Sequence, residues 1–178
     1  DNIAIGHSSL YVNTKGDRNI AIGVRALDNA DTENDNLAIG HDALGGAING
    51  GDKNVAIGNF SLDANTTGDD NVAIGYYSLN ASTTGIKNVA IGNYALDALT
   101  TGNQNAGIGY SALGGNTTGV NNNPIGYFAL NSNTTGGNNA AVGYRASYYA
   151  TAGSQNVAVG TSALERNVVG STNVAVGN

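Results

Sequence analysis

The stretch Asn54-Val55-Ala56-Ile57-Gly58 decides the fold, because variants of it recur along the whole chain. Close copies are Asn2-Ile-Ala-Ile-Gly6, Asn71-Val-Ala-Ile-Gly75 and Asn156-Val-Ala-Val-Gly160. The first residue of the motif is Asn in every copy, at positions 2, 19, 36, 54, 71, 88, 105, 122, 139, 156 and 173. Each step is 17 residues except the one of 18 from 36 to 54. The 178-residue chain is therefore ten complete units and the start of an eleventh.

The motif has the periodicity of a β-strand. Its aliphatic residues, such as Val55 and Ile57, are two positions apart and share one face, while Ala56 points to the other. Leu follows eight residues after the Asn in every complete unit but one, where Ser147 replaces it, and a Gly turn such as Thr66-Thr67-Gly68 closes many units. With 27 glycines, only Val24 to Ile39 is long enough without Gly to suggest a helix. Glycines at fixed positions are expected to supply positive φ angles.

A 17-residue unit of strands and turns predicts an all-β fold, a parallel β-solenoid of ten coils formed by residues 1–178 as a single repeat domain. At about 4.8 Å per coil the rod would be roughly 48 Å long. Identical residues would then stack from coil to coil. We expect the motif asparagines to form a hydrogen-bonded ladder, which comprises Asn2, Asn19, Asn36, Asn54, Asn71, Asn88, Asn105, Asn122, Asn139, Asn156 and Asn173.

The middle residue of the motif is small or compact throughout. We expect the aliphatic residues on either side to fill the coil and this column to pack against another chain, in a closed bundle of three parallel copies. The alternative is that the alanines lie under a corner of their own chain. The predicted trimer-interface residues are Ala4, Ala21, Ala38, Ala56, Ala73, Ala90, Gly107, Pro124, Ala141, Ala158 and Ala175.

The repeated Asn-Val-Ala-Ile-Gly motif resembles the heads of YadA-like trimeric autotransporter adhesins. The longer unit ending in Asn-Thr-Thr-Gly, as at Asn65–Gly68 and Asn116–Gly119, is similar to repeats of phage tail-fibre proteins. This resemblance covers essentially the whole chain and implies a left-handed β-roll, a homotrimer and an extracellular location on a virion tail fibre or a bacterial cell surface. The 17-residue unit is longer than the adhesin head repeat. Because the chain begins and ends inside the motif, we expect it to be an excerpt of a longer fibre.

Aromatic residues gather at the two positions after the motif glycine. They are Phe60 and the predicted receptor- or glycan-binding residues Tyr76, Tyr77, Tyr94, Tyr110, Tyr127, Phe128 and Tyr144. An exposed stripe of this kind could stack on sugar rings of a host-surface glycan or bind a protein receptor. The same residues could instead pack between chains.

The composition argues against other classes of function. With no Cys and two separated histidines, His7 and His41, we predict no catalytic residues, no metal site and no cofactor, so no enzyme. The net charge of −6 argues against a nucleic-acid partner, and no apolar run is long enough for membrane insertion. A glycan-cleaving fibre would need two facing carboxylates.

The sequence therefore predicts a non-enzymatic structural or adhesive segment, the shaft or head of a homotrimeric fibre that attaches to a host cell or surface. Repetition of identical surfaces along a stiff rod would convert weak contacts into avidity. The alternative is a monomeric ligand- or ice-binding β-solenoid. Adjacent threonines, such as Thr66 and Thr67, favour turns whose hydroxyls satisfy backbone groups over a flat ice-binding face.

Overall fold

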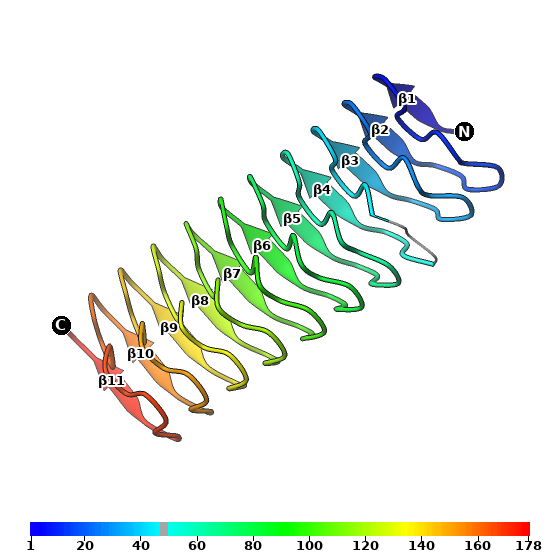
Figure 1. Ribbon diagram of the computed structural model, residues 1–178. Coiled ribbons are helices and arrows are strands. Elements are labelled where there is room, and N and C mark those ends of the chain that lie inside the picture. Colours follow the sequence, from blue (N-terminus) through cyan, green and yellow to red (C-terminus); the bar gives the residue numbers. More distant parts are fainter. Residues whose placement is uncertain (47–49) are drawn as a thin grey trace.

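The chain forms a straight stack of coils, seen edge-on in the computed structural model, which describes residues 1–46 and 50–178 (Figure 1). Every motif supplies one three-residue strand, and no helix occurs among the described residues, so the suggested helix over 24–39 is absent and β3 lies there instead. The strands are β1 (Ile3–Ile5), β2 (Ile20–Ile22), β3 (Leu37–Ile39), β4 (Val55–Ile57), β5 (Val72–Ile74), β6 (Val89–Ile91), β7 (Ala106–Ile108), β8 (Asn123–Ile125), β9 (Ala140–Val142), β10 (Val157–Val159) and β11 (Val174–Val176).

The eleven strands make one parallel sheet in sequence order. Register is in step with the repeat, so that Ala56 pairs with Ala73, and Ile57 with Ile74. Backbone hydrogen bonds continue around the coil outside the strands, as from Leu79 N–H to the carbonyl of Ala95 at 3.0 Å. The predicted parallel β-solenoid of ten 17-residue coils is confirmed. The one-residue insertion in the third unit adjoins residues 47–49, which lie outside the described part of the chain.

The interior of the coils is small, and in most coils it holds a single Leu side chain. Leu62, Leu79, Leu96, Leu113 and Leu130 are fully buried, and they pack against the middle residue of the strands. The contact is close where Gly107 replaces Ala, because a Cβ there would lie 2.2 Å from Cδ1 of Leu96. The alanine face of the sheet is therefore the inner face of the solenoid.

This arrangement corrects the predicted trimer interface. In the described coils the middle residue of each strand is buried inside its own chain, where it cannot contact a second one, and only the terminal strands expose it. The alternative, alanines covered by their own chain, is the arrangement observed. A coil this thin has room for one Leu only if a small residue faces it, so the Val and Ile side chains are turned outward. The corrected residues are Ala4, Ala21, Ala38, Ala56, Ala73, Ala90, Gly107, Pro124, Ala141, Ala158 and Ala175.

The two glycine columns serve different needs. The motif glycine adopts a positive φ, as at Gly58 with 134°, in line with expectation. The turn glycine does not, but a Cβ on Gly102 would lie 2.4 Å from the carbonyl oxygen of Gly119 in the next coil. Positive φ angles at the other corners are adopted by residues with side chains, among them Leu79 (50°) and Lys87 (58°). Turn glycines are thus required by the spacing of the coils.

Candidate functional site: the aliphatic face and the aromatic ridge

The motif asparagines form a buried ladder beside the sheet. The side-chain oxygen of Asn71 accepts the backbone N–H of Asn88 at 2.9 Å, and the side-chain amide of Asn88 donates to the carbonyl of Gly102 at 2.9 Å. Each Asn therefore satisfies a strand-end amide of the next coil and a turn carbonyl that would otherwise be buried without a partner. The ladder is structural, and it leaves the Asn side chains closed to ligands.

A second set of buried asparagines was read in the sequence only as part of the Asn-Thr-Thr-Gly turn. The side-chain oxygen of Asn65 accepts the N–H of Gly68 at 3.0 Å, and its amide donates to the carbonyl of the same glycine at 3.0 Å. Asn116 binds Gly119 in the same way. The two threonines of the turn have different environments. Thr66 donates its hydroxyl to the carbonyl of Thr83 at 2.8 Å, whereas Thr67 is exposed.

The outer face of the sheet carries the first and third residues of every strand, and we call these residues the aliphatic face. The third position is Ile or Val in all eleven strands. In this single chain Ile91, Ile108, Ile125 and Val142 are 37–46% exposed. No charged residue occupies either column. The result is a flat apolar strip along the length of the rod, on one side of the molecule.

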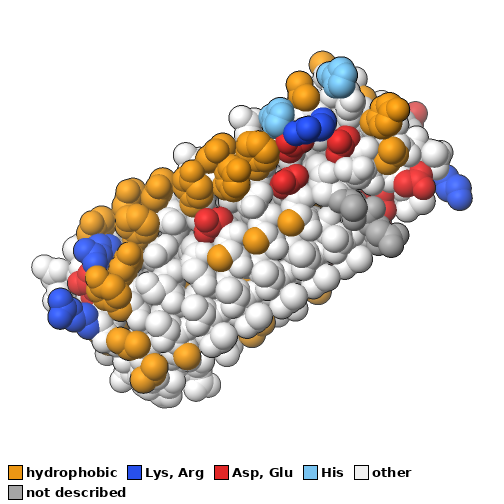
Figure 2. Space-filling view, viewed as in Figure 1, with side chains coloured by type: hydrophobic (Ala, Val, Ile, Leu, Met, Phe, Trp, Pro, Cys, Tyr) orange, Lys and Arg blue, Asp and Glu red, His pale blue; other side chains and the backbone are white. Residues whose placement is uncertain are grey.

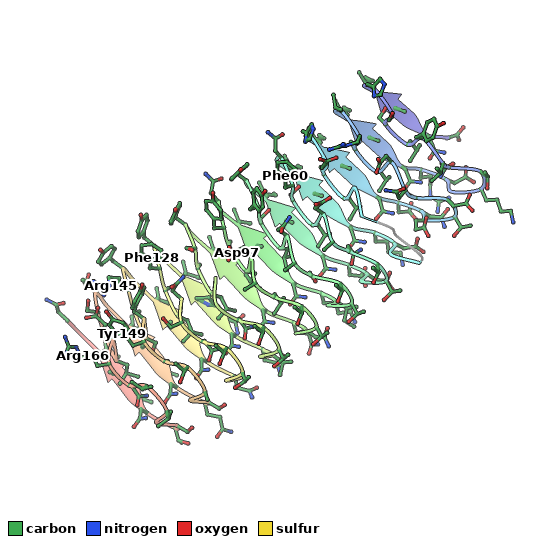
Figure 3. All side chains as sticks on the ribbon, in the orientation of Figure 1. Phe60, Asp97, Phe128, Arg145, Tyr149 and Arg166 are labelled. Carbon is green, nitrogen blue, oxygen red and sulfur yellow. The ribbon has the colours of Figure 1, made fainter. Side chains whose placement is uncertain are left out.

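The aromatic side chains lie along the corner that follows the strands, where they form what we call the aromatic ridge. It runs without a break from His41 and Phe60 to Tyr148 and Tyr149 through ring-to-ring contacts. Figure 2 shows the apolar side chains as a continuous row along one edge of the rod, and Figure 3 places Phe60 and Phe128 on that edge. The ridge is therefore held together within one chain, an arrangement not foreseen from the sequence.

Ring geometry limits what the ridge can bind. Tyr127 stacks on Tyr110 with ring centroids 5.0 Å apart and planes 12° apart, and on Tyr144 at 5.9 Å and 19°. The centroid separation matches the coil spacing of about 4.8 Å, so the rings lie one over another along the rod. Both faces of Tyr127 are covered by its neighbours. Tyr127 consequently offers its ring edge and hydroxyl to a partner, in place of the open ring face that sugar stacking needs.

Charged residues form short-range networks at the two ends of the rod. In the N-terminal half Arg25 pairs with Asp42, which also lies 3.1 Å from the His41 ring. Burial raises the pKa of Asp63, and the neighbouring carboxylates of Asp42 and Asp28 raise it further. At the other end Arg145 pairs with Glu165 at 2.7 Å, and its guanidinium lies 4.6 Å from the centre of the Tyr148 ring.

These networks do not assemble a metal centre among the described residues. Over 1–46 and 50–178, no three His, Cys, Asp or Glu side chains are grouped so as to hold a metal ion. The same ranges contain no helix with the length and apolarity of a membrane span.

A groove of about 590 Å³ lies near the C-terminal end, and we call it the C-terminal groove. Its walls are Ser132, Tyr149, Thr151, Arg166 and Val168, from three successive coils. The repeated positions of the sequence did not predict this groove. The signal was present as a departure from the repeat, because positions that hold Ala or Gly in the central units hold Tyr149 and Arg166 here.

Comparison of the chain with protein-family models, curated proteins and solved structures gave no match. The assignment of function therefore depends on the surfaces described above.

Proposed function

We propose that the chain is a non-enzymatic structural and adhesive segment of a homotrimeric extracellular fibre, built as a left-handed β-roll and used for attachment to a host surface. The carrier would be a phage or injection-machine tail fibre or a bacterial surface adhesin. The observation that carries the proposal is the aliphatic face, a mostly Ile and Val strip along the rod that is partly exposed in β2 to β5 and more exposed from Ile91 onward.

An apolar strip of this length is costly for an isolated soluble protein. Monomers rarely expose contiguous apolar patches above a few hundred Å². Water-facing sheet surfaces usually carry charged or polar side chains, yet the two outward columns hold only Ile, Val, Leu, Ala and a single Asn, Asn123. A partner that covers the strip must match a repeat of about 4.8 Å over eleven strands, and a second copy of the chain does so automatically.

The small core of one chain also favours association with further copies. Most coils bury one Leu, which contributes roughly 1.5–3 kcal/mol, and most of their other interior residues are small or polar; the coil of Leu96 also buries Leu99. Burial of the outward aliphatic residues between chains would add two more large side chains to most coils, and one to the coils of β7, β8 and β9. Three parallel rods around one axis close the arrangement without leaving an apolar face open. The resemblance to trimeric adhesin heads and tail-fibre repeats supports the same number and the left hand.

A rod of three identical faces suits attachment by many weak contacts. The aromatic ridge and the C-terminal groove occur once per chain and would occur three times per fibre, so that binding to a dense surface gains from multivalency. In this arrangement the aliphatic columns replace the alanine column as the interface.

Sedimentation equilibrium tests the proposal. We expect the chain to have three times its 17.8 kDa mass, and Ile108→Glu, which places a carboxylate in the middle of the aliphatic face, to reduce the mass to that of one or two chains. Thr101→Glu, on an exposed turn, should leave the mass unchanged. A wild-type chain that stays monomeric at all concentrations contradicts the proposal.

One observation favours the alternative of a monomeric ice-binding solenoid. Thr67, Thr84, Thr101, Thr118 and Thr135 are exposed in a single row at the coil spacing. The adjacent threonines donate their hydroxyls to backbone carbonyls, as Thr83 does to Thr100 at 3.2 Å, so only one free row is available. Thermal hysteresis by a monomeric protein would support this alternative against the fibre.

A further inference from the structure

The C-terminal groove exists because two large side chains interrupt a column of small ones. Ten residues after the motif Asn, the central units carry Ala64, Ala81, Ala98 and Gly115, which leave the surface flat. The next three units carry Ser132, Tyr149 and Arg166 at this position. Tyr149, 43% exposed, and Arg166 rise from adjacent coils (Figure 3), and both side chains line the groove.

Arg166 gives the groove a free positive charge. Its side chain is exposed, and no ion pair of it occurs among residues 1–46 and 50–178, whereas nearby Arg145 is paired with Glu165. Twelve of the thirteen acidic residues lie before residue 98, so Glu165 alone lies in this part of the rod. Glu165 is itself paired with Arg145, so an anionic ligand in the groove meets little repulsion from nearby carboxylates.

The other walls offer an apolar surface and hydroxyl groups. The Tyr149 ring is fixed from one side by Tyr148, with centroids 4.7 Å apart at 90°, and the Arg145 guanidinium lies 5.9 Å from its centre. Thr151 donates its hydroxyl hydrogen to the carbonyl of Val168 at 3.2 Å, which leaves its oxygen lone pairs as acceptors. These groups are complementary to an acidic sugar. An arginine can pair with its carboxylate, an aromatic ring can pack against the sugar ring, and a hydroxyl oxygen can accept from a sugar hydroxyl.

The groove lies on the side of the rod away from the aliphatic face. Each buried Leu enters the coil from the segment opposite the strand, as Leu96 does toward position 107, and the groove residues follow that Leu position by two and four residues. Association through the aliphatic face would therefore leave the groove open in each copy.

We propose that the C-terminal groove binds a carboxylated sugar residue of a surface glycan, of the sialic acid or uronic acid class. The carboxylate pairs with the Arg166 guanidinium, the ring lies against Tyr149, and a sugar hydroxyl donates to Thr151. This inference rests on the proposed attachment function and specifies its ligand. The volume of about 590 Å³ is in the range of small-ligand sites and accommodates one or two sugar units.

Calorimetric titration with two acidic probes and their neutral counterparts tests the inference. The probes are sialyllactose against lactose, and trigalacturonate against its methyl ester, which distinguish the two sources of the carboxylate. We expect one acidic probe to bind at one site per chain, at least about tenfold more tightly than its neutral counterpart. Equal affinity for the acidic and neutral forms, or no binding of either acidic probe, would overturn the inference.

Variants locate the site. Arg166→Ala and Tyr149→Ala should each weaken binding by about tenfold or more, and both side chains are exposed enough to be removed without loss of the fold. Lys87→Ala and Tyr11→Ala are matched controls on exposed residues of other coils and should bind as the wild type does. Unchanged affinity in Arg166→Ala would overturn the proposal.

The repeat also permits a gain-of-function test. The quadruple substitution Ala64→Ser, Ala81→Tyr, Ala98→Arg and Thr100→Val reproduces the five wall residues in three central coils, where Thr83 already occupies the position of Thr151. We expect two sites per chain in this variant, and a folded variant that still binds at one site counts against the assignment. Sedimentation equilibrium on the same samples gives the oligomeric state independently of sugar binding. A trimer without acidic-sugar binding refutes this inference alone, and sugar binding by a monomer refutes the fibre alone.

Discussion

The side-chain oxygen of Asn71 accepts the backbone N–H of Asn88 at 2.9 Å, one coil further along the rod. Asn88 in turn accepts the N–H of Asn105 at 3.0 Å, so a single residue type links successive coils through the buried corner beside the sheet. Replacement of one member therefore affects two coils.

Asn88→Ala should destabilise the rod by about 2–5 kcal/mol. The substitution leaves the buried N–H of Asn105 and the carbonyl of Gly102 without partners, and each unsatisfied group costs about 1–3 kcal/mol. Thr101→Ala, on an exposed turn, is the control and should change the free energy of unfolding by less than about 0.5 kcal/mol. Urea denaturation measures both, and equal effects of the two substitutions would contradict a structural role for the ladder.

Gly102→Ala should cost about 3 kcal/mol or more, although the φ of Gly102 is one that alanine adopts. The added Cβ would meet the carbonyl oxygen of Gly119 at 2.4 Å and force two coils apart. Gly137→Ala is the comparison, because its nearest atom is 3.0 Å away, and its loss should be clearly smaller. Thermal unfolding of the two variants checks the order, and a milder effect at Gly102 would show that coil spacing is not the constraint.

Lys87→Gly should stabilise the protein by roughly 0.5–1 kcal/mol. Lys87 is exposed with a φ of 58°, a conformation that costs a residue with a side chain about 1–2 kcal/mol, partly offset by the greater unfolded-state entropy of glycine. Asn tolerates this region better, so Asn121→Gly, with a φ of 57°, should change stability less. The midpoint of urea denaturation compares the stability of the two variants with that of the wild type. A loss of stability in Lys87→Gly would contradict the strain argument.

Asp97→Asn should stabilise the fold at pH 7, and the gain should become smaller on acidification. Burial raises the pKa of Asp97, so the folded state binds its proton more tightly than the unfolded state does. The charged form therefore destabilises the fold above the folded pKa, and protonation removes this cost as the pH falls through it. An amide gains further because Asn131, in the same column, donates to the carbonyl of Ser111 at 2.9 Å.

Unfolding at pH 7 and pH 3 measures this difference, with the exposed Asp70→Asn as control. A gain from Asp97→Asn that is the same at both pH values would contradict the assignment to the buried carboxylate.

The repeat was sufficient to predict the coil, its period and the parallel register, because every motif must meet its own copy one turn later. It was not sufficient to predict which strand face turns inward. Alternation separates Val55 and Ile57 from Ala56 but does not say which side is the interior, and the usual expectation places the larger residues there. The Leu that most coils bury reverses that expectation, since it fills the interior and leaves room only for a small residue such as Ala56.

The candidate ligand-binding surfaces could likewise be predicted from the sequence only in part. The positions of Tyr110, Tyr127 and Tyr144 in one column were evident in the sequence, but their mutual stacking depends on a coil spacing close to the thickness of stacked rings. The C-terminal groove depends on two departures from the repeat, Tyr149 and Arg166, which an emphasis on the shared positions had passed over.

Cross-linking of single cysteines tests most directly whether the aliphatic face joins parallel copies of the chain. The protein has no native cysteine, so Val159→Cys on the outer face of β10 and Ala98→Cys on the opposite side of the rod give a clean comparison. Parallel association brings each Val159 close to its own copy in the neighbouring chain, and a short bis-maleimide should cross-link Val159→Cys efficiently and Ala98→Cys hardly at all. Equal cross-linking of both variants, or preferential cross-linking through Ala98→Cys, would contradict the account.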